Sequence, residues 1–559
     1  MGNMEEEKDS GAHKTHGQHE SGHEKQVEHA NAGGHGQGKA HKNHVQENAK
    51  TLGVIAKEAI KEKEQPLHEH LMEISMKRSF LIPSAEIYGA SSGFYDYGPI
   101  GCLIKKRIEN EWRRQFLVRN GFLEIETCMV LPQIVLQASG HVGSFSDPLV
   151  ECKKCKGSFR ADHLVSQQTS ESVQNANAQQ LVEMIKKYAV LCPNCNEPTL
   201  GEVGTFNLMF KTNVGAAEGN TAYLRPETAQ GIFLDFGRIF RNFGSKLPIA
   251  VGQVGRSFRN EISPRQALVR MREFTQMEIE YFFNPQNPKM ENFSEIADVK
   301  MRLGEDEASA REMGASEAVA QKIIPNEIMA FFMANQQLFY ERVGVPKEKF
   351  YFRVLGEKER PHYSLGNIDM EVQSSFGWIE TVGNAYRTDF DLSSHAKFSK
   401  QDLSVFVEEE KKRLLPHVVE PSMGVDRLFW CVLEHTYRGK SAQKDWEWFD
   451  LPPCIAPYDA AVFPLMKKDG LAEKAQEVCR LLRENGLAIN YSESGSIGKR
   501  YARADEVGVC YCITVDYDTL KDGTVTVRFR NDGGQVRFKI EELAQKISGF
   551  SREGKTSLQ

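Results

Sequence analysis

The sequence predicts a multidomain α/β (α+β) protein, in which a large sheet-based domain with helices precedes a smaller α/β domain. The chain has 559 residues, which is too long for one core and suggests three or four domains of about 150 residues. Two strand-like runs, 249–258 and 272–283, flank a loop and predict a hairpin. Beyond residue 457, apolar strands alternate with amphipathic helices, which is typical of an α/β domain.

Charge and hydropathy exclude several classes of protein. The formal net charge is −6, so a nucleic acid would have to bind local basic patches, and non-specific DNA binding is disfavoured. No apolar run approaches the roughly 20 residues that cross a bilayer, and the N-terminus lacks the apolar segment of a signal peptide. We therefore expect a cytoplasmic protein with no membrane and no DNA partner.

The N-terminal region divides into a tail and the start of the larger domain. Residues 1–50 contain half of the 16 histidines and few apolar residues, which predicts a disordered His-rich tail; loose metal binding or a pH-responsive tether is the alternative. Within 51–150, an apolar stripe every fourth residue predicts a long helix over 101–119. A strand over 122–130 follows and ends before Pro132.

Four cysteines form the clearest metal signal. Cys152 and Cys155 make one CxxC pair, and Cys192 and Cys195 make a second, with 36 residues between the pairs. Four thiolates in this arrangement predict one tetrahedral zinc ion in an insertion over 151–200. Four sulfurs leave no open coordination position, so the zinc would be structural. Unligated thiols or a redox pair is the alternative.

The run 272–283 has strict alternation, so its side chains divide between two faces of a strand. One face carries an aromatic ring among acids and a cation: Arg272, Phe274, Gln276, Glu278 and Glu280. The other carries Thr275, Met277, Ile279, Tyr281 and Phe283, which is a core pattern. The polar face is therefore either exposed to water or the floor of a site, and a plain charged edge ribbon is the alternative.

Several strings in the chain resemble the class II aminoacyl-tRNA synthetases. FRNEISPR and REFTQMEIE resemble motif 2 of that family, EPSMGVDR resembles motif 3, and the helix, strand and proline of 101–132 resemble motif 1. LRPETAQGIF, over 224–233, closely resembles the glycyl enzymes. The resemblance implies an antiparallel-sheet catalytic domain over 51–150, 201–284 and 346–450, and an anticodon-binding domain over 457–550. Residues 285–345 have a mostly helical pattern and are interpreted as an insertion.

The resemblance also implies the site residues. Arg259 would bind the α-phosphate of ATP and Arg427 the γ-phosphate, which makes these two the expected catalytic residues. The expected ATP contacts are Arg259, Asn260, Glu261, Val269, Arg270, Met271, Arg272, Glu273, Phe274, Glu380, Thr381, Gly424, Val425, Asp426 and Arg427, with Glu380 also a magnesium ligand. The expected glycine contacts are Arg160, Glu227, Phe274, Thr275, Gln276, Met277, Glu278, Arg387, Glu420, Pro421, Ser422, Met423 and Gly424.

Simple chemistry explains these residue types. An amino-acid carboxylate is already an ionised nucleophile, so its attack on the α-phosphorus needs charge neutralisation and alignment rather than a general base. Clustered carboxylates suit a small zwitterion whose only cationic group is its amine. On local grounds alone, Glu227 could instead begin a helix, and Glu380 and Arg387 could be ordinary ion pairs at a sheet edge.

The expected activity is therefore the ATP-dependent attachment of glycine to tRNA(Gly) by a homodimer, with Mg²⁺ and structural Zn²⁺. Lys499, Arg500 and Arg503 would contact tRNA phosphates, unless they belong to a solvated basic helix. Two alternatives remain open. One is a class II synthetase for another small amino acid, and the other is a non-catalytic nucleic-acid-binding protein on the same scaffold, which would be expected to lack the phosphate-binding arginines.

Overall fold

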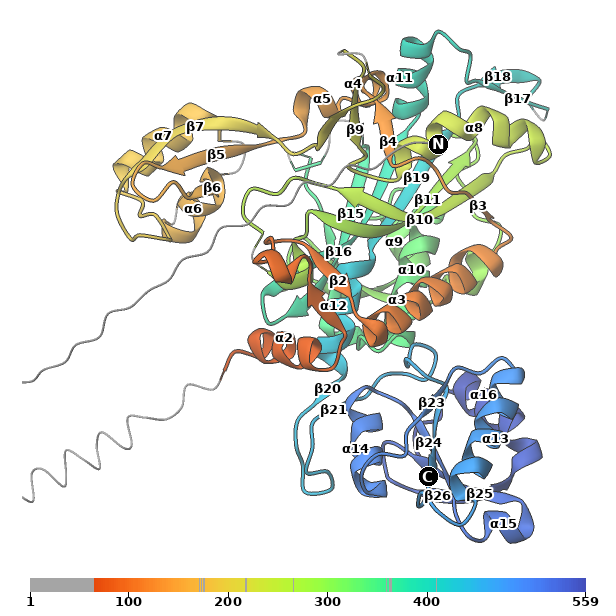
Figure 1. The fold of residues 1–559 in the computed structure, drawn as a ribbon. Helices are drawn as coiled ribbons and strands as arrows, with labels where there is room; N and C mark the ends of the chain where they lie inside the picture. The colour runs from red at the N-terminus through yellow and green to blue at the C-terminus, as the bar shows by residue number, and fades with distance from the viewer. Residues whose placement is uncertain are drawn as a thin grey trace, which may run out of the picture. The chain divides into compact units, whose positions relative to one another are not determined.

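The computed structural model describes residues 65–558 except positions 170, 172, 174, 175, 217, 218, 265, 358, 361–363 and 409. The predicted His-rich tail lies outside the described residues. The largest sheet has nine strands in the order β13-β12-β14-β15-β16-β19-β11-β10-β3. Figure 1 labels β15, β16, β19, β11, β10 and β3 of this sheet. Its strands are β3 (Leu123–Glu124), β10 (Ile249–Phe258), β11 (Glu273–Phe283), β12 (Lys300–Gly304), β13 (Arg311–Gly314), β14 (Phe350–Val354), β15 (Gly366–Ser374), β16 (Gly377–Thr388) and β19 (His417–Gly424).

Strand β11 lies inside this sheet, not at its edge. It pairs antiparallel with β10 on one side and with β19 on the other. The edge-ribbon interpretation is therefore wrong. The sheet is mostly antiparallel, as expected, with parallel pairing only of β3 with β10 and of β12 with β14 among its described strands.

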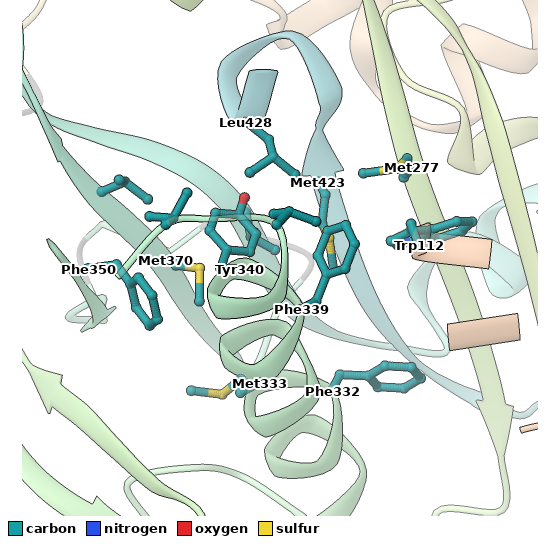
Figure 2. Close-up of a cluster of buried hydrophobic side chains, with 14 of the residues drawn as sticks. Trp112, Met277, Phe332, Met333, Phe339, Tyr340, Phe350, Met370, Met423 and Leu428 are labelled. Carbon is teal, nitrogen blue, oxygen red and sulfur yellow. The ribbon is translucent and has the colours of Figure 1, made fainter. Parts of the chain in front are cut away.

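Helix α10 (Glu327–Arg342) packs against this sheet and is buried along most of its length. Figure 2 shows Phe332, Met333, Phe339 and Tyr340 of α10 in a cluster of buried apolar side chains that also includes residues of α3, the sheet and α12. A helix that is mostly apolar and buried on nearly every side belongs in a core rather than on a surface.

The segment 285–345 therefore differs from the predicted helical insertion. It contributes α9 (Ala315–Ala320) and α10, but it also supplies β12 and β13, which extend the sheet beyond β14. The short strands β12 and β13 gave no strong alternation in the sequence, and their pairing with each other and with β14 determines their conformation.

The helix and strand predicted before Pro132 also differ in detail. Helix α3 spans Pro99–Trp112 and continues as a π-helical turn over Arg113–Val118, with the predicted apolar stripe fully buried. The predicted strand divides into two pieces. β3 pairs with β10, whereas β4 (Val130–Pro132) joins a separate sheet with β8 (Lys211–Asn213) and β9 (Thr221–Leu224).

The cysteine-bearing insertion forms a small unit with its own core. Its sheet has the order β6-β5-β7. Its elements are β5 (Ser146–Cys152), β6 (Ser158–Arg160), α6 (Ala161–Gln168), α7 (Ala178–Lys187) and β7 (Leu200–Asn207). The sheet therefore extends a few residues beyond both ends of the predicted insertion, 151–200, because β5 and β7 pair along most of their length.

The C-terminal region alternates strands and helices as predicted and has a separate core. Its five-stranded sheet has the order β23-β22-β24-β25-β26. The elements are β22 (Ala460–Pro464), α13 (Leu471–Glu484), β23 (Ile489–Tyr491), α14 (Ile497–Glu506), β24 (Tyr511–Val515), α15 (Thr519–Asp522), β25 (Thr524–Phe529), β26 (Gln535–Lys539), a 3₁₀ turn (Ile540–Glu542) and α16 (Leu543–Glu553).

A buried lysine joins the C-terminal sheet to the segment that precedes it. Lys444 is 6% exposed, and its Nζ donates to Asp505 Oδ2 at 3.1 Å and to the backbone oxygen of Arg530 at 2.6 Å. Asp505 also accepts two hydrogen bonds from Arg528, at 2.9 and 3.0 Å. In the same segment, Phe449 packs into the core of the larger domain. The connecting segment is thus packed against both domains.

The remaining helices are α2 (Leu67–Lys77), α4 (Gln133–Ala138), α5 (His141–Ser144), α8 (Ala229–Asn242), α11 (Phe390–Ser399) and α12 (Val425–Thr436), with 3₁₀ turns at Glu86–Tyr88, Ala267–Val269, Phe293–Glu295 and Lys347–Lys349. Three two-stranded sheets pair β1 (Leu81–Pro83) with β2 (Tyr95–Tyr97), β17 (Val405–Val407) with β18 (Lys412–Leu414), and β20 (Tyr437–Arg438) with β21 (Trp448–Phe449). Across the part of the chain that the structure describes, every helix is too short or too polar to span a bilayer.

Candidate active site

A pocket lies over the centre of the nine-stranded sheet, on the polar face of β11 that the sequence analysis marked as a possible floor. Strands β15, β16 and β19 and the loop between β10 and β11 complete its walls. The lining residues are Glu227, Arg259, Glu261, Leu268, Val269, Arg270, Met271, Phe274, Gln276, Glu278, Leu355, Glu359, Asn367, Asp369, Glu380, Thr381, Gly383, Ala385, Glu420, Ser422, Gly424, Asp426 and Arg427. Residues from all the predicted motif 2, motif 3 and RPETAQG segments therefore meet in one cavity.

Two of the three arginines that line the pocket, Arg259 and Arg427, are held in place by neighbouring groups. The Arg259 guanidinium lies between the rings of Phe145 and Phe274, 5.4 and 5.3 Å from their centroids. Arg427, in the first turn of α12, donates from Nε to the backbone oxygen of Val269 at 3.0 Å and from NH1 to that of Glu380 at 2.6 Å. Both cations are held by neighbouring groups before any ligand binds, which favours charge stabilisation without reorganisation.

Asp369 and Glu380 form a pair of oxygen donors beside Arg427. A Cβ atom at Gly383 would lie 3.7 Å from Asp369 Oδ1 and 3.9 Å from Glu380 Oε1, so the two carboxylates converge over this glycine. Burial, followed by the nearby Glu380 carboxylate, raises the pKa of Asp369 to about 8. Carboxylate oxygens are hard ligands of the kind that a divalent cation such as Mg²⁺ prefers. Asp369 was missed because it lies in an apolar strand, and only its pairing across the β15–β16 hairpin reveals it.

A second group of residues that line or adjoin the pocket is acidic. Arg387 NH1 donates to Glu420 Oε2 at 2.5 Å, and an Arg387 nitrogen lies 3.9 Å from Glu227 Oε1. Glu278 accepts a short hydrogen bond from the Thr228 hydroxyl. Glu227, Glu278 and Glu420 come from three separate segments of the chain.

The pKa values of these acids diverge because their partners differ. Burial raises the pKa of Glu227, but His141 and Arg387 outweigh it and hold the value well below normal. Burial and the Glu227 charge raise the pKa of Glu278. Burial also raises the pKa of Glu420, against the opposing effect of Arg387. Such a cluster attracts a cationic ligand group, because an added positive charge relieves the repulsion among the acids.

His141 and Asp391 support this acidic region and were missed by the sequence analysis. His141 Nε2 lies 3.4 Å from Glu227 Oε2. Asp391 accepts hydrogen bonds from Arg387 Nε and NH2 at 2.7 and 2.9 Å. Arg387 lies at the end of strand β16 and Asp391 at the start of α11 (Phe390–Ser399), so the two meet across a strand-to-helix junction that no helical spacing in the sequence indicated. For His141, no local pattern in the sequence indicated a contact with Glu227.

Several predicted site residues do not line the pocket: Arg160, Asn260, Arg272, Glu273, Thr275, Met277, Arg387, Pro421, Met423 and Val425. Met277, Met423 and Val425 are buried in the apolar core. Thr275 is on the opposite face of β11, where its hydroxyl accepts from Lys105 Nζ at 2.9 Å. Alternation explains these positions, since neighbours of a pocket residue on a strand point away from the pocket.

The other corrections concern charged residues. Arg160 pairs with Asp147 at 2.9 Å and with Asp162 at 2.6 Å in the insertion. The Arg272 guanidinium donates hydrogen bonds to the backbone oxygens of Ser92 and Glu261. Glu273 pairs with Arg256 at 3.4 Å. Arg387 acts behind the pocket wall by holding Glu420.

Asp426 lines the pocket, but its carboxylate holds neighbouring elements together. Its carboxylate accepts from the Tyr97 hydroxyl and from the Thr275 backbone N–H, each at 2.5 Å. These bonds tie the start of α12 to β2 and β11.

The four predicted zinc ligands converge in the insertion. Their sulfurs all lie within 4.8 Å of one another, with Cys152 and Cys195 3.7 Å apart and Cys155 and Cys192 3.5 Å apart. A tetrahedral ion with Zn–S bonds of about 2.3 Å separates its sulfurs by about 3.8 Å.

The two CxxC turns also have the same backbone geometry. Lys156 N–H donates to Cys152 O at 2.9 Å, and Asn196 N–H donates to Cys192 O at 2.8 Å. Lys156 and Asn196 both have positive φ, at 59° and 55°. The residues therefore fit a four-sulfur metal site built from two equivalent turns.

In the C-terminal domain, the structure separates the three predicted tRNA contacts. Arg500 is 3% exposed and donates to the backbone oxygens of Pro464 and Leu465 at 2.5 and 3.2 Å, so it supports the fold and is not a phosphate contact. Lys499 and Arg503 are exposed on α14.

Comparison with known proteins now identifies the family. A tRNA synthetase class II core domain (G, H, P, S and T) matches residues 210–436, and an anticodon binding domain matches 459–549. The chain is 40% identical to the glycine–tRNA ligase of Methanocaldococcus jannaschii, over 88% of this chain and 100% of that one. It is 38% identical to the glycine–tRNA ligase of Pyrococcus furiosus, over 86% and 98%.

The chain belongs to the glycine–tRNA ligase family. This assignment confirms the resemblance to the glycyl branch of class II and the expected fold. At the level of fold alone, the chain also resembles the prolyl-tRNA synthetase of Cryptosporidium parvum in complex with halofuginone and AMPPNP, with a TM-score of 0.53, 13% identity and coverage of 87% of this chain and 75% of that one.

Proposed function

We propose that the chain attaches glycine to tRNA(Gly) at the expense of ATP, through a glycyl-adenylate intermediate. The observation that carries this proposal is the single pocket in which Arg259 and Arg427 face Glu227, Glu278 and Glu420, in a member of the glycine–tRNA ligase family. An acidic cluster binds an ammonium and the arginines bind phosphates, so the two groups of residues match the two substrates.

In the first step, the glycine ammonium binds among Glu227, Glu278 and Glu420. The glycine carboxylate then attacks the α-phosphorus of ATP, a P–O bond forms, and pyrophosphate leaves. Arg259 neutralises charge on the α-phosphate and Arg427 holds the departing phosphates, while the half-buried ring of Phe274 supplies a face for adenine. Alignment and charge neutralisation suffice because the nucleophile is already ionised.

In the second step, a hydroxyl of the 3′-terminal ribose of tRNA attacks the carbonyl carbon of the adenylate, and AMP leaves. The exposed Lys499 and Arg503 of α14 are the residues proposed to contact tRNA phosphates. The anticodon binding domain match over 459–549 supports a tRNA-contacting role for this region.

Two metals complete the proposal. Asp369 and Glu380 would hold Mg²⁺, which when bound neutralises the phosphates of ATP. Cys152, Cys155, Cys192 and Cys195 would hold a structural Zn²⁺, because their sulfurs have the spacing of a tetrahedral site. The cytoplasmic location stays a prediction.

We also infer a homodimer. The elements of the motif 1 region expose large apolar side chains to solvent. Val118 is 74% exposed and Met129 is 46% exposed. Exposed large apolar residues on elements that otherwise support a core favour a protein contact surface.

Pyrophosphate exchange with a panel of amino acids tests the proposal. We expect glycine alone to support exchange, whereas exchange with threonine, proline or serine would favour a synthetase for another amino acid. The Arg259→Ala variant should lose about 100-fold to 1000-fold in exchange rate, as for other fixed charge donors. Exchange at the wild-type rate in that variant would end the role assigned to Arg259, and no exchange with any amino acid would favour a binding protein.

A further inference from the structure

Glu280 is a buried acid that the proposed mechanism does not use. It lies on β11 two residues after Glu278, on the same face of the strand, and its exposed fraction is 0%. Within the described residues, neither of its carboxylate oxygens has a hydrogen-bond partner. A buried carboxylate without donors is strongly disfavoured in its ionised form.

The groups nearest to Glu280 are other carboxylates. Glu278, Glu280 and Glu420 each place an oxygen within 4.8 Å of the others. Glu278 and Glu420 both have donors that stabilise their charge, since the Thr228 hydroxyl donates to Glu278 and Arg387 NH1 donates to Glu420. Glu280 faces acceptors, so a proton on its carboxyl group would convert an unfavourable acceptor pair into a hydrogen bond.

The other charged groups around the cluster also favour a proton on Glu280. Arg387, from β16, pairs with Asp391 of α11 as well as with Glu420. The single Arg387 guanidinium therefore stabilises the charge of more than one acid. Burial, followed by the charges of Glu420 and Glu278, places the pKa of Glu280 well above its usual range. The carboxyl group with the fewest donors is the one expected to keep the proton.

We propose that Glu280 holds a proton in the enzyme and acts as a neutral hydrogen-bond donor to the Glu420 carboxylate, which positions that carboxylate for the glycine ammonium. Glu280 is then a positioning residue beneath the binding site. Its neutral form limits the number of negative charges facing the ammonium, and its hydrogen bond adds a second donor to Glu420 besides Arg387. This inference rests on the glycine-binding role proposed for the pocket.

A matched pair of isosteric variants, Glu280→Gln and Glu278→Gln, tests the proposal by glycine-dependent pyrophosphate exchange. Glutamine keeps a neutral donor at position 280, so we expect the KM for glycine to change by less than about 3-fold. At position 278 it removes an ionised partner of the ammonium, and the KM for glycine should rise by about 10-fold to 100-fold, as for a charge-assisted hydrogen bond. Glu280→Leu, which has no donor, should raise the KM for glycine by about 10-fold and leave that for ATP unchanged.

An infrared difference spectrum of the wild type against Glu280→Gln supplies a readout that folding effects do not produce. We expect loss of one protonated carboxyl C=O band. A Glu280→Gln protein as impaired as Glu278→Gln, or one that keeps the band, would overturn the proposal; so would a folded Glu280→Leu protein with the wild-type KM. Absence of glycine-dependent exchange in the wild type would instead remove the proposed function itself.

Discussion

At the scale of a residue, the raised pKa of Glu280 predicts a pH dependence of stability. Burial, followed by the charges of Glu420 and Glu278, holds the folded pKa of Glu280 well above the reference value of 4.5, so above that reference value the unfolded chain is ionised at this position while the folded chain keeps its proton. Stability therefore falls as pH rises above the reference value. Glu280→Gln lacks this titration, so its free energy of unfolding should improve relative to wild type from about pH 5 to about pH 8.

Urea unfolding at several pH values measures this difference. The prediction concerns the slope of the free energy of unfolding with pH, because any other effect of the substitution is constant with pH. We expect a relative gain on the order of 1 kcal/mol per pH unit at most. Glu295→Gln, which changes an exposed acid on the surface, is the control, and its slope should equal that of wild type. Equal slopes for Glu280→Gln and wild type would contradict the raised pKa.

Single residues in the pocket show what a sequence can predict. Arg259, Glu227 and Glu420 were predictable because their strings resemble family motifs. Met277 was predicted to contact glycine, although strict alternation places it on the core face of β11, where the structure buries it. Asp369 was not predictable from a local string, because its partner Glu380 becomes a neighbour only through the β15–β16 hairpin.

At the scale of elements, the long periodic segments were predictable and the short strands were not. The helix α13 and the strand β11 have clear periods and form as expected. In contrast, β12 and β13 have four or five residues each and exist because of their neighbours in the sheet. The segment 285–345 was therefore interpreted as mostly helical when its strands are part of the central sheet.

The cysteine-bearing insertion should depend on its metal. Its own core is small, and its two CxxC turns come from opposite ends of the unit, so a tetrahedral ion would link the ends. We expect about one zinc per chain by elemental analysis, and chelation should expose amide hydrogens of β5 and β7 to exchange while the central sheet stays protected.

Cys192→Ser should reproduce the effect of the chelator, whereas Cys479→Ser, which changes a buried cysteine in the C-terminal domain, should keep the zinc content. Full protection of β5 and β7 after complete metal removal would show that the insertion is stable without the ion.

At the scale of the whole molecule, the packed connecting segment holds the C-terminal domain to the larger one through Lys444. Replacement of Lys444 by Met removes the hydrogen bonds to Asp505 and to the Arg530 backbone, while Asp505 keeps its two bonds from Arg528. We expect aminoacylation of tRNA to fall about fivefold or more, since only that step uses both domains. Pyrophosphate exchange should stay within about twofold of the wild type.

The exposed Lys440→Met change in the same segment is the matched control for Lys444→Met. Equal losses of exchange and aminoacylation would indicate a general folding defect in place of a role in domain placement.

The proposed dimer predicts a response to charge at the motif 1 surface. Val118→Asp places a carboxylate where an apolar contact is expected, and sedimentation velocity at micromolar concentration should show a shift from dimer to monomer. Leu520→Asp alters an exposed apolar residue of the C-terminal domain, 45% exposed, and should leave the sedimentation coefficient unchanged. A wild-type protein that sediments as a monomer at all concentrations would refute the dimer.

The position of β11 has a further consequence for how this protein can change over time. Consecutive residues of β11 serve opposite faces, with Phe274, Gln276 and Glu278 on the pocket side and Met277 in the core. Inserting or deleting a single codon here would turn every following side chain over, which would drive acids into the apolar layer and methionine into the cavity. This strand can therefore diverge by exchange of one amino acid for another but not by a change of length.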